Sequence, residues 1–148
     1  NDIGLPIERS HIFGYEAANA KNLPQIVKGI MSDDDDTCVL QMSCIHLLAV
    51  LLQNSTEWEH SITTQKVINL GMIPKLVQCL DDGHRSCQSA LNVLNNIAWK
   101  GSIGNAQVLV DAGIIPKLCL LMNSSNAKVA EQSTIILGNL ANKNNAMI

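Results

Sequence analysis

The side chains best suited to chemistry are cysteines and histidines in the first two thirds of the chain. Cys79, His84 and Cys87 offer zinc-binding atoms, but their Cys-x4-His-x2-Cys spacing matches no zinc finger or ribbon. The residues that could join them are Cys38, Cys44 and His46. Cys79 falls in one predicted helix and Cys87 begins the next, so buried thiols are the favoured interpretation. A Cys–His nucleophile would lack an orienting group and an oxyanion hole, so we predict no metal, no cofactor and no catalysis.

The composition favours helices packed around an aliphatic core. The 148 residues are 47% hydrophobic but only 3% aromatic, so Leu, Ile, Val, Ala and Met must fill the core. The five cysteines are an odd number without the close spacing of a disulfide framework, which indicates reduced thiols in the cytoplasm or nucleus. The sequence shows no apolar stretch as long as a membrane span and no signal peptide at its beginning.

The charges are sparse and scattered. The ten Lys and Arg residues do not cluster, so the basic surface of a nucleic-acid-binding protein is missing. The only charge run is four aspartates at residues 33–36, for which we predict a solvated loop. These aspartates or Ser32 would cap a helix that begins near Thr37, and attraction of a basic partner is the alternative. We expect neither nucleic acid nor membrane as a direct partner.

An internal repeat of about 42 residues organises the chain. The segment GMIPKL at 71–76 recurs as GIIPKL at 113–118, and the segment around Asn96 recurs around Asn139, 43 residues later. A looser copy begins with LPQIV at 23–27. In the two clear copies a helix ends at Gly71 or Gly113, and proline follows in the first turn of the next helix. A longer third helix is predicted at 86–99 and again at 126–142.

The third helix of the last copy carries an apolar stripe that neighbouring repeats must bury. Its residues are Val129, Ser133, Ile136, Leu137, Leu140 and Ala141. The candidate N-caps before it are Ser124, Ser125 and Asn126. Three helices per unit, with Gly-x-Ile-Pro between the first two, resemble the armadillo repeat more than the two-helix HEAT repeat. The resemblance implies an all-α, right-handed superhelical solenoid of about three repeats, whose third helices line a concave groove.

The repeats divide the chain into five segments. We predict an N-terminal leader at 1–20, armadillo repeats at 21–56, 57–99 and 100–142, and the start of a further repeat at 143–148. The sequence at 145–148 resembles the opening of the preceding first helix at Asn105 and Ala106. We therefore expect further repeats after residue 148.

Among armadillo proteins, the chain most resembles the N-terminal repeats of the importin-α family of nuclear-import adaptors. The segments that carry the resemblance, between about residues 23 and 141, are LPQIVKGI, VINLGMIPKLVQCL, LNNIA, VLVDAGIIPKL and VAEQSTIILGNLA. The resemblance implies a receptor of the cytoplasm and nucleus that holds basic nuclear-localisation peptides extended in the groove. Asn side chains would bond the peptide backbone, while Trp faces and acidic groups would hold its Lys and Arg side chains.

The groove positions of that family are only partly kept. Asn96, Gln132 and Asn139 match, whereas Asn92 and Ile135 stand where the family has Trp. Lys143 replaces an acidic residue and would repel a lysine of the peptide. The complete set of predicted groove residues is Ser89, Asn92, Asn96, Trp99, Gln132, Ile135, Asn139 and Lys143. For Trp99 the alternatives are an aromatic anchor in the groove and packing against a loop.

Two functions fit this pattern. The first is a non-catalytic adaptor that binds a protein or an extended peptide in the groove, with nuclear-localisation cargo bound weakly because of the substitutions. The second is an importin-α-derived scaffold that has lost such binding and holds a different protein. Ile135 favours the second, because an apolar side chain on an open face usually marks a partner or a packing contact.

Overall fold

The computed structural model describes residues 20–32 and 38–146. The predicted leader, apart from Ala20, and the four aspartates at 33–36 lie outside these described residues. Every regular element within them is a helix, so the predicted all-α class is confirmed. The elements are η1 (Ala20–Asn22), α2 (Leu23–Ile30), α3 (Cys38–Asn54), α4 (Glu57–Asn69), α5 (Met72–Gln78), α6 (Cys87–Lys100), α7 (Ile103–Asp111), α8 (Ile114–Leu121) and α9 (Ala127–Ala146).

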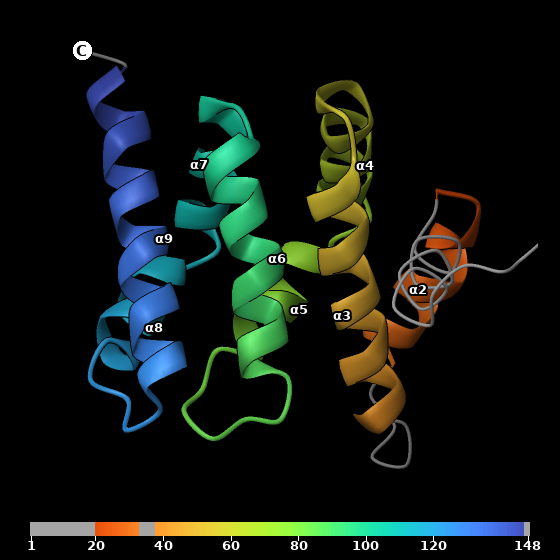
Figure 1. The fold of residues 1–148 in the computed structure, drawn as a ribbon. Coiled ribbons are helices and arrows are strands. Elements are labelled where there is room, and N and C mark those ends of the chain that lie inside the picture. The colour runs from red at the N-terminus through yellow and green to blue at the C-terminus, as the bar shows by residue number, and fades with distance from the viewer. Residues whose placement is uncertain (1–19, 33–37, 147–148) are drawn as a thin grey trace, which may run out of the picture.

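The helices form two layers, as expected for a solenoid of a few repeats. The long helices α3, α6 and α9 lie side by side in the layer nearest the viewer in Figure 1, and the shorter helices α4, α5, α7 and α8 lie behind them. Helix α6 packs against α3 on one side and α9 on the other. The exposed face of this front layer is therefore built from equivalent helices of successive repeats.

Sharp bends at two glycines fold each repeat back on itself. Gly71 and Gly113 precede α5 and α8 with φ angles of 74° and 86°, in the left-handed region where a side chain would be strained. Pro74 and Pro116 follow in the first turn of the next helix, as the repeated motif predicts. Among the described residues no single helix is long and apolar enough to cross a membrane; α7 and α8 reach that length only as a pair bent by 78°.

The core runs along the buried face of the long helices. On α6, Leu91, Leu94 and Ile97 are fully buried between the neighbouring repeats. The predicted stripe on α9 is buried at four positions, while Leu137 is half-buried and Ala141 is exposed. The buried Ser133 hydroxyl donates to the Val129 carbonyl at 2.7 Å, which satisfies its hydrogen-bonding need within the helix.

Local capping fixes where the helices begin. The side chain of Asn126 accepts from the backbone N–H of Lys128 at 3.0 Å, which confirms it as the cap of α9. Ser102 and Asn105 form a reciprocal capping box at the start of α7, with bonds of 3.1 and 3.0 Å. At its other end α9 continues to Ala146, and the start of a further repeat at 143–148 stays a prediction. No glycine or proline interrupts the helix there.

Candidate functional site

Two parallel rows of side chains line the open face of the long helices. The row on α6 consists of Asn92, Asn96 and Lys100, and the row on α9 consists of Ile135, Asn139 and Lys143. Residues four apart lie on one side of a helix, and α6 and α9 are packed against each other, so the two rows run side by side. Each row has the same order along its helix: a position at which the resembled family has Trp, then an Asn, then a Lys.

The amides of the rows are bonded within the protein. The side chain of Gln132 donates to Asn92 Oδ1, and Asn139 Nδ2 donates to Asn95 Oδ1 at 2.9 Å, so two hydrogen bonds join α9 to α6. Asn96 Nδ2 donates to the Asn92 carbonyl of its own helix at 2.9 Å. A peptide that uses these amides must replace the existing bonds, which lowers the net gain from each.

One amide atom beside the rows is left without a partner. The Oε1 atom of Gln132 is buried and accepts no hydrogen bond within the described part of the chain. A buried acceptor in this state costs free energy. Ile135 is 43% exposed, so the apolar side chain expected on the open face is there. Ser89 lies half-buried on α6 one turn before Asn92, and its role stays a prediction.

Trp99 lies at the end of α6 and is exposed rather than packed against a loop. Its side chain is 63% exposed, and the Lys100 ammonium lies 5.4 Å from the centre of its ring. Lys143 of α9 donates to the carbonyl of Gly101, in the turn between α6 and α7. Trp99, Asn139 and Lys143 line a shared hollow of about 330 Å³. The structure thus brings three of the predicted groove residues together at this end.

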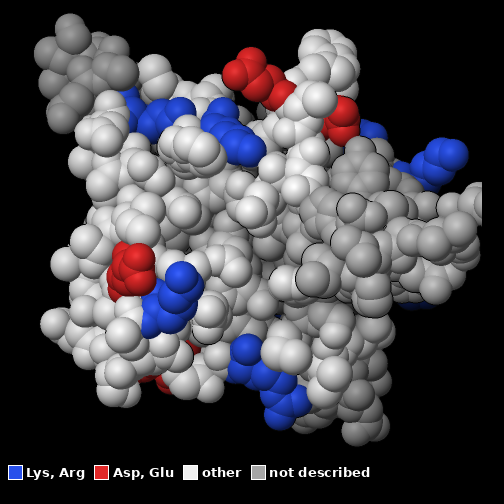
Figure 2. Space-filling view, in the orientation of Figure 1, with Lys and Arg blue, Asp and Glu red and all other residues white. Residues whose placement is uncertain are grey.

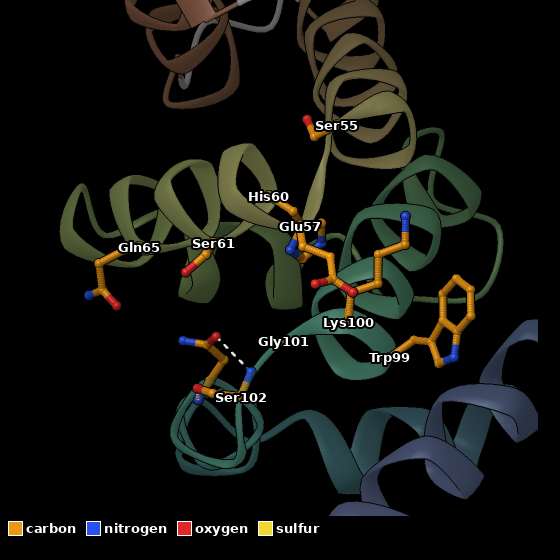
Figure 3. Close-up of a pocket in the computed structure, with 10 residues that line it drawn as sticks. Ser55, Glu57, His60, Ser61, Gln65, Trp99, Lys100, Gly101 and Ser102 are labelled. Atoms are coloured by element: carbon orange, nitrogen blue, oxygen red, sulfur yellow. Dashed lines mark hydrogen bonds between the residues drawn. The ribbon is translucent and has the colours of Figure 1, made fainter.

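A larger hollow of about 680 Å³ lies on the other side of Trp99, between α4 and the α6–α7 turn. Figure 3 shows Glu57 and His60 pointing from α4 toward this turn, while the Trp99 ring points away from them. Lys100 also lines this hollow. This hollow could not be predicted from the sequence, because no spacing pattern connects His60 with the third helix. The 43-residue offset that relates Asn96 to Asn139 also relates Lys100 to Lys143 and could have revealed Lys100.

His60 is a buried polar side chain in the wall of this hollow. Its Nδ1 lies 3.3 Å from the Thr64 hydroxyl, and its Nε2 has no partner among the described residues. Burial lowers the pKa of His60, the nearby Lys100 charge lowers it further, and the nearby backbone of Asn96 acts in the opposite direction. The imidazole is therefore neutral at pH 7.

Three of the four cysteines whose side chains the structure describes are part of the core, as the sequence predicts, and the side chain of Cys38 lies outside the described residues. Cys44, Cys79 and Cys87 are buried, whereas Cys119 is exposed. Burial raises the pKa of the Cys87 thiol to about 11, and the carboxylates of Asp82 and Asp81 add to the shift. A thiol in this state is a poor nucleophile at neutral pH.

Basic side chains lie at both ends of the open face. In Figure 2, which has the orientation of Figure 1, blue basic side chains lie over the upper ends of α6 and α9, red acidic side chains lie beside them toward α4, and further blue side chains lie at the lower end of α6. A red and a blue side chain lie together lower on α9. The upper ends of these helices carry Lys100 and Lys143. The segments that hold the two rows, 92–100 and 135–143, contain no Asp or Glu. The rows therefore lack the acidic groups that would attract the Lys and Arg side chains of a basic peptide.

Comparison with known proteins places these features in context. Residues 102–142 match the family model described as armadillo/beta-catenin-like repeat. The chain is 32% identical over 123 residues to importin subunit alpha-6 of Arabidopsis thaliana, covering 82% of this chain and 21% of the relative. It is 33% identical over 130 residues to importin subunit alpha-1a of Oryza sativa subsp. japonica, covering 86% and 23%. The chain thus spans only about a fifth of the length of these relatives.

Solved structures show the same fold. A designed armadillo repeat protein superposes with a TM-score of 0.64 at 25% identity, covering 79% of this chain and 46% of that one. A second designed armadillo repeat protein, in complex with the peptide (KR)4, has a TM-score of 0.64 at 19% identity over 89% of this chain and 56% of its own. At 19% identity the second likeness bears on the fold alone.

Proposed function

We propose that this chain is a non-catalytic module that binds an extended segment of another protein along α3, α6 and α9. The chain is an array of armadillo repeats that resembles the N-terminal repeats of importin α. The observation that carries the proposal is the pair of parallel rows, in which Asn96 and Asn139 occupy equivalent places on successive helices. The importin subunits among its relatives support the same interpretation. The module would act in the cytoplasm and nucleus.

The proposed binding chemistry follows from the amide side chain. An Asn amide both donates and accepts, so it can pair with the N–H and the C=O of one residue in an extended strand. Asn96 and Asn139 would exchange their present bonds, to the Asn92 carbonyl and to Asn95 Oδ1, for bonds to the segment. Because one hydrogen bond replaces another, each contact contributes modestly, and orientation of the segment is the main result.

The second proposed function, a scaffold that no longer reads basic nuclear-localisation signals, is favoured over a working import receptor. Asn92 and Ile135 provide no aromatic faces for lysine stems, and Asn92 is bonded to Gln132. Lys143 places a positive charge beside Asn139 in the hollow that a basic side chain would enter. A lysine-rich segment would therefore lose attraction at two positions and meet repulsion at a third.

Three matched octapeptides, Ser-Lys, Ser-Gln and Ser-Glu each repeated four times, test whether the groove binds extended segments. At least one should shift the side-chain NH₂ resonances of Asn96 and Asn139 in NMR titrations of the chain. Asn96→Ala combined with Asn139→Ala should weaken that peptide about tenfold or more, at about 0.5–1.5 kcal/mol per net hydrogen bond. Asn123→Ala, in the loop before α9, is the matched control and should leave affinity unchanged.

Two results would contradict the proposed function. The first is that none of the three peptides shifts the resonances of Asn96 or Asn139. The second is that the shifts map to the opposite layer, on α5 and α8, and persist in the Asn96→Ala and Asn139→Ala variant.

A further inference from the structure

We propose that the groove selects an acidic extended segment, whose carboxylates pair with Lys100 and Lys143 on either side of Trp99. This inference rests on the proposed function, because it names the chemistry of the segment that the same face would hold. Lys100 follows Asn96 by four residues, and Lys143 follows Asn139 by four. A cation therefore occupies the same place in two successive repeats, so it recurs with the period of the array.

The charges of these two lysines are not compensated by carboxylates. Lys100 Nζ lies 3.5 Å from the Gln53 carbonyl, and Lys143 Nζ donates to the Gly101 carbonyl. Carbonyl oxygens are neutral, so each ammonium keeps its full charge. Within residues 20–32 and 38–146, neither ammonium pairs with a carboxylate. An anion from outside the chain would supply the negative charge that each ammonium lacks.

Each of the two lysines lines a hollow large enough for a carboxylate group. Lys143 lines the hollow of about 330 Å³ and Lys100 lines the hollow of about 680 Å³, and Trp99 forms part of both walls. The one acidic residue among the described linings of these two hollows is Glu57, which stands on α4 away from the Trp99 ring (Figure 3). The exposed Trp99 ring offers an apolar surface between the two cations.

The spacing suits an extended chain. Packed helices lie about 8–10 Å apart, whereas side chains two residues apart on an extended strand point the same way at about 6.6–6.8 Å. Lysine has a flexible four-carbon stem that can cover this difference. Two acidic residues separated by one residue can thus reach Lys100 and Lys143 together, while the backbone between them lies over Trp99 and the Asn row.

A purely structural role for the two lysines is the competing explanation. A cation in the last turn of a helix interacts favourably with the helix dipole, and both lysines lie near the ends of their helices. Substitution by Gln separates the two explanations, because Gln keeps a donor for the Gln53 or Gly101 carbonyl and removes the charge. A structural role predicts a change in stability, whereas the acidic-segment role predicts a change in peptide selectivity.

Calorimetry with the three octapeptides tests the selectivity on the chain as it stands. The Ser-Glu peptide should bind most tightly and the Ser-Lys peptide least tightly. Lys100→Gln and Lys143→Gln should each weaken the Ser-Glu peptide about two- to fivefold, as expected for exposed charge pairs, and change the Ser-Gln peptide less than about twofold. Lys128→Gln, in the first turn of α9, removes the same charge from the same helix and should change neither affinity. Raising the salt concentration should reduce the advantage of the Ser-Glu peptide.

The outcomes separate this inference from the function on which it rests. Equal or tighter binding of the Ser-Lys peptide, or loss of Ser-Glu affinity in Lys128→Gln as large as in Lys143→Gln, would overturn the acidic preference while leaving a peptide-binding groove. Binding of a single-stranded octanucleotide as tightly as the Ser-Glu peptide, with the same loss in the Lys variants, would also overturn it, since the surface would then read any polyanion. Absence of binding by all three peptides would remove the proposed function itself.

Discussion

The two ends of the α6 and α9 pair use charge in different ways. At the end where the helices begin, Lys117 pairs with Asp81 at 2.7 Å and Ser124 donates to Asp82 at 2.7 Å, so each aspartate is bonded to the next repeat. At the end where they finish, Lys100 and Lys143 contact backbone carbonyls. Charge at the first end is paired with a charge or a hydroxyl group of the next repeat, whereas the two lysines at the second end contact neutral backbone carbonyls and no carboxylate among the described residues.

The comparison indicates where stability and where specificity reside. The aspartates and the buried Cys87 lie at the end where α6 begins and where bonds between repeats are made. Trp99 and the lysines lie at the end with the larger hollow. Substitutions at the first end should therefore change unfolding free energy, and those at the second should change peptide affinity.

The largest expected effect is a change of ligand preference along the two rows. Asn92→Trp, Ile135→Trp and Lys143→Asp together should strengthen binding of a (KR)4 peptide by about one to three decades, measured by calorimetry. Each of the two new Trp side chains should contribute about 0.5–2 kcal/mol per contact with a cation of the peptide. Lys143→Asp replaces repulsion between two positive charges by an attraction of up to about 1 kcal/mol. High salt should remove the part that comes from the new carboxylate at position 143, so the gain should shrink as salt rises.

The same variant offers an internal control. Lys143→Asp alone should reverse the order of the Ser-Glu and Ser-Lys peptides with little effect on the Ser-Gln peptide. If (KR)4 binds the unmodified chain tightly and Asn96→Ala abolishes that binding, the two rows still bind basic segments, and the proposed loss of such binding is wrong.

The sequence predicts the bends and the bounds of the helices well, because these depend on local sequence signals. Gly71 and Gly113 adopt the left-handed conformation that the repeated Gly-x-Ile-Pro motif requires. The long helices predicted at 86–99 and 126–142 lie at Cys87–Lys100 and Ala127–Ala146. Backbone chemistry of this kind needs only neighbouring residues, so one sequence suffices to find it.

The hydrogen bonds between side chains of the site could not be predicted from the sequence. The bonds from Gln132 to Asn92 and from Asn139 to Asn95 join residues 40 and 44 apart, and the choice among nearby amides depends on how α6 and α9 pack. His60 reaches the larger hollow from a different helix layer, so its burial could not follow from the third-helix pattern. Ala141 is exposed although the stripe predicted its burial, because periodicity identifies a face and not what covers it.

An intermediate effect is expected from pH at the first end. The pKa of Cys87 is about 11 in the folded chain, above the ordinary value of 9.0, so the thiol ionises first in the unfolded chain as pH rises. Its stabilising contribution is complete below about pH 9 and is lost as pH approaches 11. Between about pH 8.5 and 10.5 the unfolding free energy should fall about 1.5–2 kcal/mol more in the natural chain than in Cys87→Ala, measured by urea denaturation at each pH.

Cys119 provides the matched comparison for this prediction. Its side chain is exposed on α8, so Cys119→Ala should keep the pH dependence of the unmodified chain. An identical loss of stability with pH in Cys87→Ala and in the unmodified chain would show that ionisation of Cys87 is not coupled to unfolding. The aspartates would then be the one feature that links the first end to stability.

The smallest expected effect concerns the ion pair between repeats at the first end. Asp81→Asn removes the charge partner of Lys117, and because the two side chains are 62% and 33% exposed, the unfolding free energy should fall by only about 0.2–1 kcal/mol. A double-mutant cycle with Lys117→Gln isolates the coupling between them, which should shrink at high salt. The affinity for the Ser-Glu peptide should stay within about twofold, since this pair lies at the opposite end from Lys100 and Lys143. A peptide-affinity change in Asp81→Asn as large as that in Lys143→Gln would mean that the two ends are coupled through α6 and α9, and the division between a stabilising end and a recognising end would fail.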